Sequence, residues 1–309
     1  MMRSPKIIFI VGPTAVGKSA VAVFLAKQIK GEIISCDAMQ VYQEVHIASN
    51  KPSPQELKDI PHHLIDIVSV EQKFDVAQFN QLALVRIQEI HRKGHIPIVA
   101  GGSGFYAQVL LDGIFEDGER DEELREALKQ KALEEGPGVL YEQLKMKDPK
   151  AAAKIHPNDV KKLIRAMEVC LSENKPISQL QPNRKGIWGQ YDISLFVLNQ
   201  PREKLYQRID ERVEEMFCQG LVDEIKSLLN KKLSYTAEGI IGVSEIRGYL
   251  NGEYPLEEAK NLMKRNTRHY AKRQVTWFKK DQRFEWIELS EGVSYDKVVE
   301  HIRKKIGLS

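Results

Sequence analysis

A glycine-rich segment near the N-terminus constrains the fold of this chain more than any other stretch. It consists of Gly12, Pro13, Thr14, Ala15, Val16, Gly17, Lys18 and Ser19, which fit the pattern G-x-x-x-x-G-K-[S/T]. The apolar run 7–11 before it predicts a buried strand, and 19–30 after it predicts a helix. A strand, a glycine loop and a helix in this order form a phosphate-binding loop (P-loop), whose backbone N–H groups converge on phosphate oxygens. In such a loop Lys18 supplies a positive charge, and the Ser19 hydroxyl is a ligand for Mg²⁺.

The composition limits the other classes to which the chain could belong. Its 309 residues are 42% hydrophobic and 29% charged, as in a globular protein of one or two domains. The formal net charge, 46 − 43 = +3, is too small to argue for nucleic-acid binding on its own. Three scattered cysteines indicate neither a disulfide framework nor a zinc site, and no apolar stretch approaches the length of a membrane span. We therefore expect a cytoplasmic protein that does not enter a membrane.

Short apolar runs alternate with helical periodicity in the first third of the chain. Strands are predicted at 7–11, 32–36 and 97–100, with a later one at 194–198, and helices at 19–30 and 76–93. This alternation is typical of an α/β fold of the P-loop NTPase type, a parallel sheet flanked by helices. Ligands of such sheets bind at the carboxyl ends of the strands, which here carry the P-loop, Asp37 and Gly101-Gly102-Ser103-Gly104.

Helical patterns without strands dominate the middle of the chain. Residues 112–135 hold ten acidic and four basic side chains, whereas residues 145–165 hold seven basic and two acidic ones. This reversal predicts a mainly helical insertion over 114–190. It would either present one face to a negatively charged partner or consist of solvated helices that pair with each other. Residues 1–113 and 191–309 then form the core, with a helical C-terminal part.

Asp37 is the strongest candidate for acid–base chemistry. It ends the strand after the P-loop helix, where a carboxylate can hold a metal or accept a proton; an aspartate that caps a turn is the alternative. Glycines at 101–104 would allow close approach to a ligand. Asp66 is a poor candidate for a second metal-binding aspartate, which disfavours a nucleotide hydrolase. The adjacent His62 and His63 are expected to bond backbone groups rather than a metal.

A basic segment near the C-terminus is the best candidate for contact with nucleic acid. Residues 264–283 hold eight basic side chains and one acidic one, with Tyr270, Trp277 and Phe278 interleaved. Basic and aromatic side chains together suit a sugar–phosphate backbone with unpaired bases. The alternative is a helix that buries Trp277 in the core and leaves its charges in solvent.

Together these motifs resemble the tRNA dimethylallyltransferase (tRNA isopentenyltransferase) family, bacterial type, over most of the chain. Beyond the P-loop, the resemblance rests on Ile34-Ser35-Cys36-Asp37 with Gln40-Val41-Tyr42, Lys51-Pro52, Pro61-His62-His63-Leu64-Ile65-Asp66, Gly101-Gly102-Ser103-Gly104-Phe105-Tyr106, Ile155-His156-Pro157-Asn158-Asp159 with Arg165-Ala166-Met167-Glu168, and Arg268-His269-Tyr270-Ala271-Lys272-Arg273-Gln274-Val275-Thr276-Trp277. The last segment is the most specific, because many unrelated enzymes share the P-loop.

The resemblance implies transfer of a dimethylallyl group from dimethylallyl diphosphate to N6 of the adenosine 3′-adjacent to the anticodon in tRNA, with release of diphosphate. It implies that the P-loop holds the diphosphate and that Asp37 takes the N6 proton. Thr14 would bond the bridging oxygen. Lys18 and Arg212 would stabilise the leaving diphosphate, with Arg208 as the alternative to Arg212.

The resemblance also implies which residues bind tRNA. They are Asp37, Ala38, Met39, Gln40, Ser103, Lys161, Lys162, Leu163, Ile164, Arg165, Arg268, Lys272 and Arg273. We expect a monomer that uses Mg²⁺. The chain departs from the family pattern at Ala38 (usually Ser), at Ala48-Ser49-Asn50 (usually Gly-Thr-Ala), at Ser103 (usually Thr) and at Val243 (often Tyr).

Three other functions fit parts of the pattern. An ATP-dependent kinase of small molecules or nucleotides would use the same P-loop fold, but it needs no basic helical insertion. A non-enzymatic P-loop protein that binds RNA would use the basic segments but not Asp37. A prenyltransferase that acts on free AMP or ATP would share the chemistry and use neither the insertion nor the C-terminal basic helix.

Overall fold

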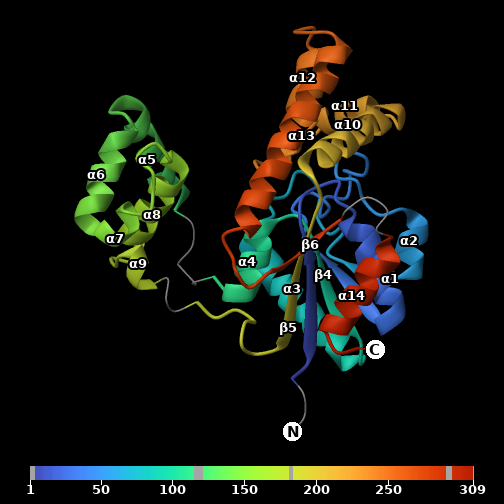
Figure 1. Cartoon of the computed structure of the whole chain (residues 1–309). Coiled ribbons are helices and arrows are strands. Elements are labelled where there is room, and N and C mark those ends of the chain that lie inside the picture. The colour runs from blue at the N-terminus through green and yellow to red at the C-terminus, as the bar shows by residue number, and fades with distance from the viewer. Residues whose placement is uncertain (1–3, 115–120, 181–183, 290–293, 309) are drawn as a thin grey trace. The chain divides into compact units, whose positions relative to one another are not determined.

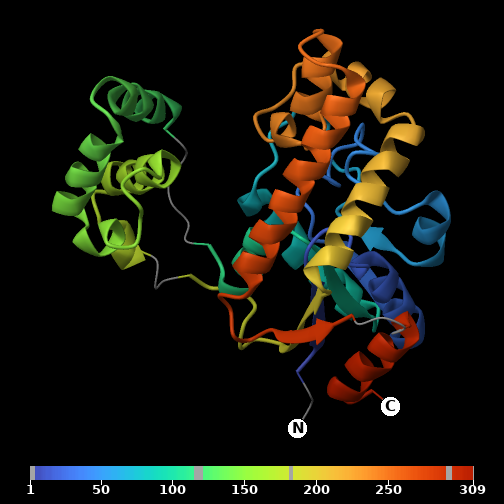
Figure 2. The ribbon, with the colours of Figure 1, turned by 45° about the horizontal axis from the view of Figure 1, so that its top comes forward.

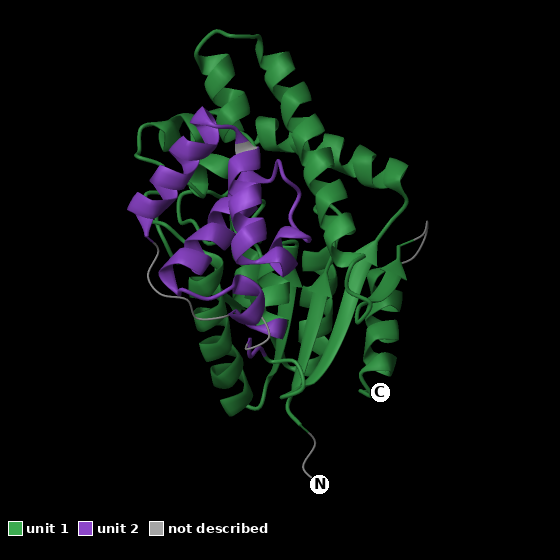
Figure 3. Ribbon diagram, turned by 90° about the vertical axis from the view of Figure 1, so that its left-hand side faces the viewer, with its two compact units in different colours: residues 1–111, 187–309 green, residues 112–186 purple. Residues whose placement is uncertain are grey.

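The computed structural model describes residues 4–114, 121–180, 184–289 and 294–308. The chain divides into two compact units, one formed by residues 1–111 and 187–309 and the other by residues 112–186. Figure 3 shows them in different colours. The insertion expected from the sequence, 114–190, begins and ends slightly later than the smaller unit.

The larger unit is built on a six-stranded parallel sheet with the strand order β3-β2-β4-β1-β5-β6 (Figure 1). The strands are β1 (Lys6–Val11), β2 (Gly31–Ser35), β3 (His62–His63), β4 (Ile96–Gly101), β5 (Asp192–Asn199) and β6 (Glu285–Glu288). The α/β fold expected from the sequence is therefore confirmed. The edge strands β3 and β6 were not predicted, because each is short and neither is a buried apolar run.

The central strand β1 shows why helices cover both faces of the sheet. Ile7, Phe9 and Val11 belong to one buried cluster, and Ile8 and Ile10 belong to another. All five side chains are fully buried. A continuous apolar run is what a parallel strand covered on both faces requires, because successive side chains point to opposite faces.

The helices of the larger unit cover the sheet and extend beyond its carboxyl edge. They are α1 (Lys18–Ile29), α2 (Pro54–Asp59), α3 (Val76–Arg92), α4 (Gly104–Asp112), α10 (Arg202–Cys218), α11 (Leu221–Leu229), α12 (Val243–Leu250), α13 (Leu256–Phe278) and α14 (Tyr295–Lys305). Figure 2 shows the long helix α13, in orange and red, beside α10, in yellow. No helix in the described part of the chain has the length and apolarity needed to cross a membrane.

All the secondary-structure elements in the described part of the smaller unit are helices. Its helices are α5 (Glu122–Glu134), α6 (Pro137–Lys147), α7 (Pro149–Ala152), α8 (Val160–Ser172) and α9 (Ile177–Leu180). A cluster of buried apolar side chains holds them together. The buried carboxylate of Glu168 accepts hydrogen bonds from Arg125 on α5 and from Arg165 on its own helix. Residues 115–120 of the expected acidic segment lie outside the described residues.

Candidate active site

The P-loop connects β1 to α1, which begins at Lys18. Gly12 has φ +147°, and a Cβ atom there would lie 2.3 Å from the carbonyl oxygen of Leu198 on β5. Only glycine fits this position, since the neighbouring strand passes directly against the loop. The strand–loop–helix arrangement expected from the sequence is therefore present at the carboxyl edge of the sheet.

Lys18 is half-buried in the P-loop, and its Nζ donates a hydrogen bond to the carbonyl oxygen of Pro13 at 2.7 Å. The pKa of Lys18 is lowered to about 7, because the lowering effects of desolvation and of the nearby Arg212 outweigh the raising effect of the Asp37 charge. A buried ammonium beside another cation is costly unless an anion joins it. This electrostatic setting favours a bound phosphate.

Two arginines from α10 reach the same place. Arg212 donates a hydrogen bond to Thr14 Oγ1 at 3.3 Å. Arg208 donates to Gln200 Oε1 and to the hydroxyl of Tyr295, both at 3.4 Å. Burial and the neighbouring Arg208 lower the pKa of Arg212. The structure thus places both arginines that were weighed in the sequence analysis beside the P-loop, and Arg212 is the one bonded to Thr14.

Asp37 follows β2 and lies at the same edge of the sheet. Its Oδ1 accepts a hydrogen bond from the backbone N–H of Met39 at 2.9 Å. Burial raises the pKa of the Asp37 carboxyl, whereas the Met39 N–H and the charge of Lys18 lower it. The balance is a raised pKa, which makes Asp37 a better proton acceptor than an exposed aspartate.

Ser103 supports the turn that carries Asp37. Its Oγ accepts a hydrogen bond from the backbone N–H of Ala38 at 3.1 Å, and it is also bonded to the hydroxyl of Tyr270 on α13. Gln40, on the same turn, is held at both ends of its amide. It accepts from Ser35 Oγ at 2.8 Å and donates to the carbonyl oxygens of the 49–50 segment at 3.3–3.4 Å.

Two of the glycines at 101–104, Gly102 and Gly104, make room for α13, whereas Gly101 packs against Cys36 and lines the cavity over the P-loop. A Cβ atom at Gly102 would lie 2.1 Å from Gln274 Nε2, and one at Gly104 would lie 2.3 Å from Trp277 Cδ1. Gln274 donates to the carbonyl oxygen of Gly102 at 2.9 Å and accepts from the N–H of Thr14 at 2.8 Å. Helix α13 is therefore fastened to the P-loop itself.

Trp277 packs against Gly104 and Phe105 and keeps 39% of its surface exposed, so it is not buried in the core. The core residue at this end of α13 is Phe278. The alternative from the sequence, in which α13 buries Trp277 in the core, is therefore wrong, because Phe278 takes that place.

Two cavities open at the carboxyl edge of the sheet. The first, of about 260 Å³, lies over the P-loop and is lined by Lys18, Ser19 and Arg208. The second, of about 230 Å³, extends from Asp37 towards α10 and α13. The two share five lining residues: Thr14, Asp37, Ser49, Asn50 and Arg212. Three of the four candidate catalytic residues, Thr14, Asp37 and Arg212, thus lie where the cavities meet, and Lys18 lines the first cavity alone.

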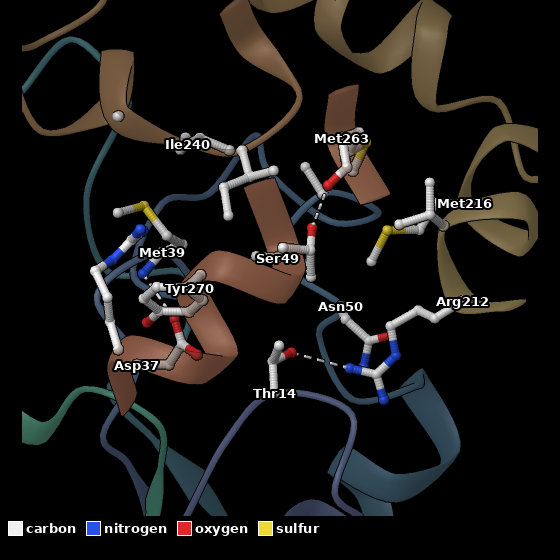
Figure 4. A pocket seen from close by; sticks show the side chains of 16 residues that line it. Thr14, Asp37, Met39, Ser49, Asn50, Arg212, Met216, Ile240, Met263 and Tyr270 are labelled. Carbon is white, nitrogen blue, oxygen red and sulfur yellow. Dashed lines mark hydrogen bonds between the residues drawn. The ribbon is translucent and has the colours of Figure 1, made fainter. Parts of the chain in front are cut away.

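The second cavity has an apolar wall that the sequence analysis missed. It is formed by Met39, Met216, Ile240, Ile241 and Met263. Figure 4 shows Met216, Ile240 and Met263 across the cavity from Asp37 and Thr14, with Tyr270 beside Asp37. Apolar residues from four separate segments give no local signal, because the same residues in a helix or loop usually belong to the core.

The predicted RNA-binding residues of α13 differ in their surroundings. Nη1 of Arg268 donates to both carboxylate oxygens of Asp210, at 2.8 and 2.9 Å. Lys272 is exposed, and Arg273 lies over the ring of Tyr270 and lines the second cavity. Contact with RNA remains a prediction for all three.

The predicted RNA-binding segment of α8 is equally mixed. Lys161 and Lys162 are exposed, and Lys162 pairs with Asp159 at 2.6 Å. Arg165 pairs with Glu168 at 2.6 Å. Leu163 is fully buried in the core of the smaller unit, so its side chain stabilises the helix and is not available to RNA; Ile164 is half-buried.

Ser19 lines the P-loop cavity, where its hydroxyl can serve as a metal ligand. Among the described residues no group of three His, Cys, Asp or Glu side chains is arranged to hold a metal. Asp66 pairs with Lys51, which agrees with its rejection as a metal ligand. His62 bonds the carbonyl oxygen of Ile60 as expected, but His63 bonds the carboxylate of Glu32 instead of a backbone group.

A P-loop, three neighbouring cations and a half-buried carboxylate on a parallel sheet define a P-loop enzyme that acts on a phosphorylated substrate. Comparison with known proteins identifies the family. Residues 40–281 match the IPP transferase family, and the chain belongs to it. The resemblance described in the sequence analysis is confirmed.

Individual relatives agree along most of their length. The tRNA dimethylallyltransferase of Alkaliphilus oremlandii is 44% identical over 304 residues, which cover 97% of this chain and 96% of the relative. The tRNA isopentenylpyrophosphate transferase of Bacillus halodurans is similar in structure, with a TM-score of 0.72, 38% identity, and coverage of 98% and 95%. A eukaryotic dimethylallyltransferase acting on tRNA gives a TM-score of 0.84 at 30% identity, with coverage of 98% and 80%.

Proposed function

We propose that this protein transfers a dimethylallyl group from dimethylallyl diphosphate to N6 of the adenosine 3′-adjacent to the anticodon in tRNA. The observation that carries the proposal is the junction of the two cavities at Asp37, Thr14 and Arg212. A polar, cationic cavity suits a diphosphate, and an apolar wall suits a branched hydrocarbon. The groups that an alkyl transfer needs lie between them.

The P-loop cavity would hold the diphosphate of the donor. Backbone N–H groups of the loop, Lys18 and Arg208 would bind its oxygens, and Arg212 and Thr14 would contact the end nearest the allylic carbon. The N–H of Thr14 itself is already bonded to Gln274, so Thr14 would act through its hydroxyl. Fixed donors that stabilise a leaving anion commonly provide the largest part of a rate enhancement.

A divalent metal fits the P-loop cavity, because the Ser19 hydroxyl and the oxygens of a bound diphosphate provide oxygen ligands of the kind that Mg²⁺ prefers. Such a metal would offset part of the diphosphate charge. Mg²⁺ usually retains several waters and binds through substrate phosphates.

Asp37 would orient the adenine amine and accept its proton. A new bond forms between N6 and the allylic carbon, the carbon–oxygen bond breaks, and its electron pair leaves with the diphosphate. The N6 proton passes to the Asp37 carboxylate. The raised pKa of Asp37 supports this role, since adenine N6 is a weak nucleophile that needs a base close to it.

The acceptor would reach the junction from the side of the second cavity. An adenosine must leave the stack of the anticodon loop to place N6 at Asp37. Exposed Lys272 and Arg273 on α13, together with Lys161 and Lys162 of the unit 112–186, would bind the tRNA backbone. The name of the structurally similar eukaryotic enzyme, which acts on tRNA, supports this choice of acceptor. The protein would act as a monomer.

The test is transfer of label from radioactive dimethylallyl diphosphate to unmodified tRNA in the presence of Mg²⁺, with AMP, ATP and adenosine as parallel acceptors. We expect label on tRNA alone. Label on AMP or ATP would contradict the choice of acceptor. Consumption of ATP with phosphate transfer and no labelled product would favour the kinase alternative, which none of the relatives supports.

A further inference from the structure

The segment 46–51 lies between β2 and α2 and forms a wall shared by both cavities. Ser49 and Asn50 line both, and Ala48 lines the second. Asn50 has φ +48°, a left-handed conformation in which asparagine is more readily accommodated than most other residues. Figure 4 shows the side chain of Asn50 beside that of Arg212, so the segment reaches the junction itself.

Glu224 on α11 fastens this segment from the outside. Its carboxylate accepts three backbone hydrogen bonds, from the N–H groups of His46, Ile47 and Ala48, at 2.9, 2.8 and 2.9 Å. Hydrogen bonds to an ionised carboxylate are stronger than those between neutral groups. A helix late in the chain thereby fixes the backbone just before the two residues that face both cavities.

Lys51 fastens the other end of the segment from the inside. Its side chain is only 5% exposed, and its Nζ donates to the carbonyl oxygen of Tyr42 at 2.5 Å and to the carboxylate of Asp66. Between these anchors, the amide of Gln40 donates to the carbonyl oxygens of Ser49 and Asn50 at 3.4 and 3.3 Å. The left-handed turn at Asn50 is thus held on both sides. The position of the Gln40 side chain depends on this turn, because the turn supplies the carbonyl oxygens to which its amide donates.

We propose that Glu224 is a positioning residue for the transfer reaction. It touches neither substrate nor any reacting atom. It holds the 46–51 segment so that Asn50 and Gln40 stand in register with Thr14, Asp37 and Arg212 when the donor and adenine meet. This inference rests on the function proposed above. Glu224 would influence the reaction only through the backbone of the segment 46–51.

The first test compares Glu224→Gln with Asp223→Asn, which removes the same charge from the exposed neighbouring position of α11. In single turnovers with excess enzyme, we expect Glu224→Gln to lower the rate constant of transfer by about 30-fold, because small misplacements of reacting groups are costly. The affinities for tRNA and for the donor should change less than about threefold, since the P-loop and the basic surface are untouched. Asp223→Asn should behave as wild type.

The rate constant separates positioning from folding. A variant that is merely less well folded loses amplitude in a single turnover but keeps its rate constant. Hydrogen exchange should show faster exchange at the amides of residues 46–48 in Glu224→Gln, with α1 and β1 unchanged. An unchanged rate constant, with these amides exposed, would overturn the proposal.

A double-mutant cycle tests whether Glu224 acts through the segment. In an Asn50→Gly background, which loosens the left-handed turn, we expect Glu224→Gln to slow transfer by less than about threefold further, because the two changes remove one effect. A full additional loss would mean that Glu224 acts elsewhere. Absence of transfer in wild type and in Asp223→Asn would instead count against the proposed function.

Discussion

The two cavities that meet at Asp37 differ in how much of their lining is local in the sequence. The largest share of the P-loop cavity comes from one continuous stretch: six of its sixteen lining residues lie between positions 14 and 20, where the chain leaves β1 and enters α1. The second cavity is assembled from the segments around residues 37–50, 212–216, 239–241 and 263–273. A short local motif can form a binding site for a diphosphate, because backbone N–H groups provide most of the hydrogen bonds. A site that brings an alkyl group to an adenine requires the completed fold.

The largest expected effect concerns the junction itself. Asp37→Asn keeps the shape of the side chain but removes the base, so we expect transfer to fall by about a thousand-fold. tRNA binding, measured by filter retention, should stay within about threefold, because its contacts are distributed over a wide surface. Transfer near the wild-type rate would remove Asp37 from the mechanism and leave the junction without a base.

Lys18→Met tests the P-loop cavity alone. It removes the cation while keeping the apolar stem, and we expect kcat/KM for dimethylallyl diphosphate to fall by about a hundred-fold. Inhibition by inorganic diphosphate should weaken in parallel, whereas tRNA affinity should not change. If tRNA affinity fell as well, the two cavities would not be separable in this way.

The pH dependence of the reaction tests the charge of Lys18 in a second way. Because burial lowers the pKa of Lys18 to about 7, the free enzyme loses this charge as the pH rises above that value. We expect kcat/KM for the donor to fall about tenfold per pH unit in the alkaline range, since this parameter reports the free enzyme. Lys18→Arg, whose guanidinium stays charged, should be less active but lack this decline.

Met216→Gln tests the apolar wall of the second cavity. A buried amide facing a hydrocarbon should raise KM for dimethylallyl diphosphate by about tenfold. Inorganic diphosphate, which has no alkyl group, should inhibit the variant as it inhibits wild type. Met146→Gln serves as the control, since Met146 is 79% exposed in the other unit. Equal losses for both ligands would place Met216 outside the path of the donor.

The smallest effects are expected at the basic residues of α13 that lie outside the second cavity. Lys272→Ala should lower the salt dependence of tRNA binding by about one unit of slope, as expected for one lost phosphate contact. Arg268→Ala should lower it less, because the Arg268 guanidinium is already paired with Asp210. Equal slopes for the two variants would show that the ion pair opens when RNA binds.

The sequence predicted the elements whose signal is local. The strand at 7–11, the P-loop and the helix after it follow from apolar continuity and glycine spacing, and the position of Asp37 follows from the rule that sites lie at the carboxyl ends of parallel strands. The resemblance to a family then brought in Arg212, which the structure places against Thr14. Its distance along the chain gave no other signal for the pairing.

The rest depended on contacts between distant segments. Gln274 stood within a motif that the resemblance already used, yet nothing in the spacing indicated that its amide bonds the P-loop backbone. Gly102 and Gly104 were expected to allow the approach of a ligand but make room for α13, because a glycine that admits a helix and one that admits a substrate look alike in a sequence. Glu224 carried no signal, since a glutamate on an amphipathic helix is usually solvated.

The bond from Gln274 to Thr14 also bears on the order in which the molecule can be completed during synthesis. The phosphate-binding loop is synthesised long before Gln274, the residue 260 positions later whose side chain accepts a hydrogen bond from its backbone. β1 also waits for its neighbour β5, which is made much later. A nascent chain that stops before α13 would therefore display the whole motif without the means to hold its shape. The P-loop, although it is synthesised early, therefore reaches its final shape only after α13 has been made.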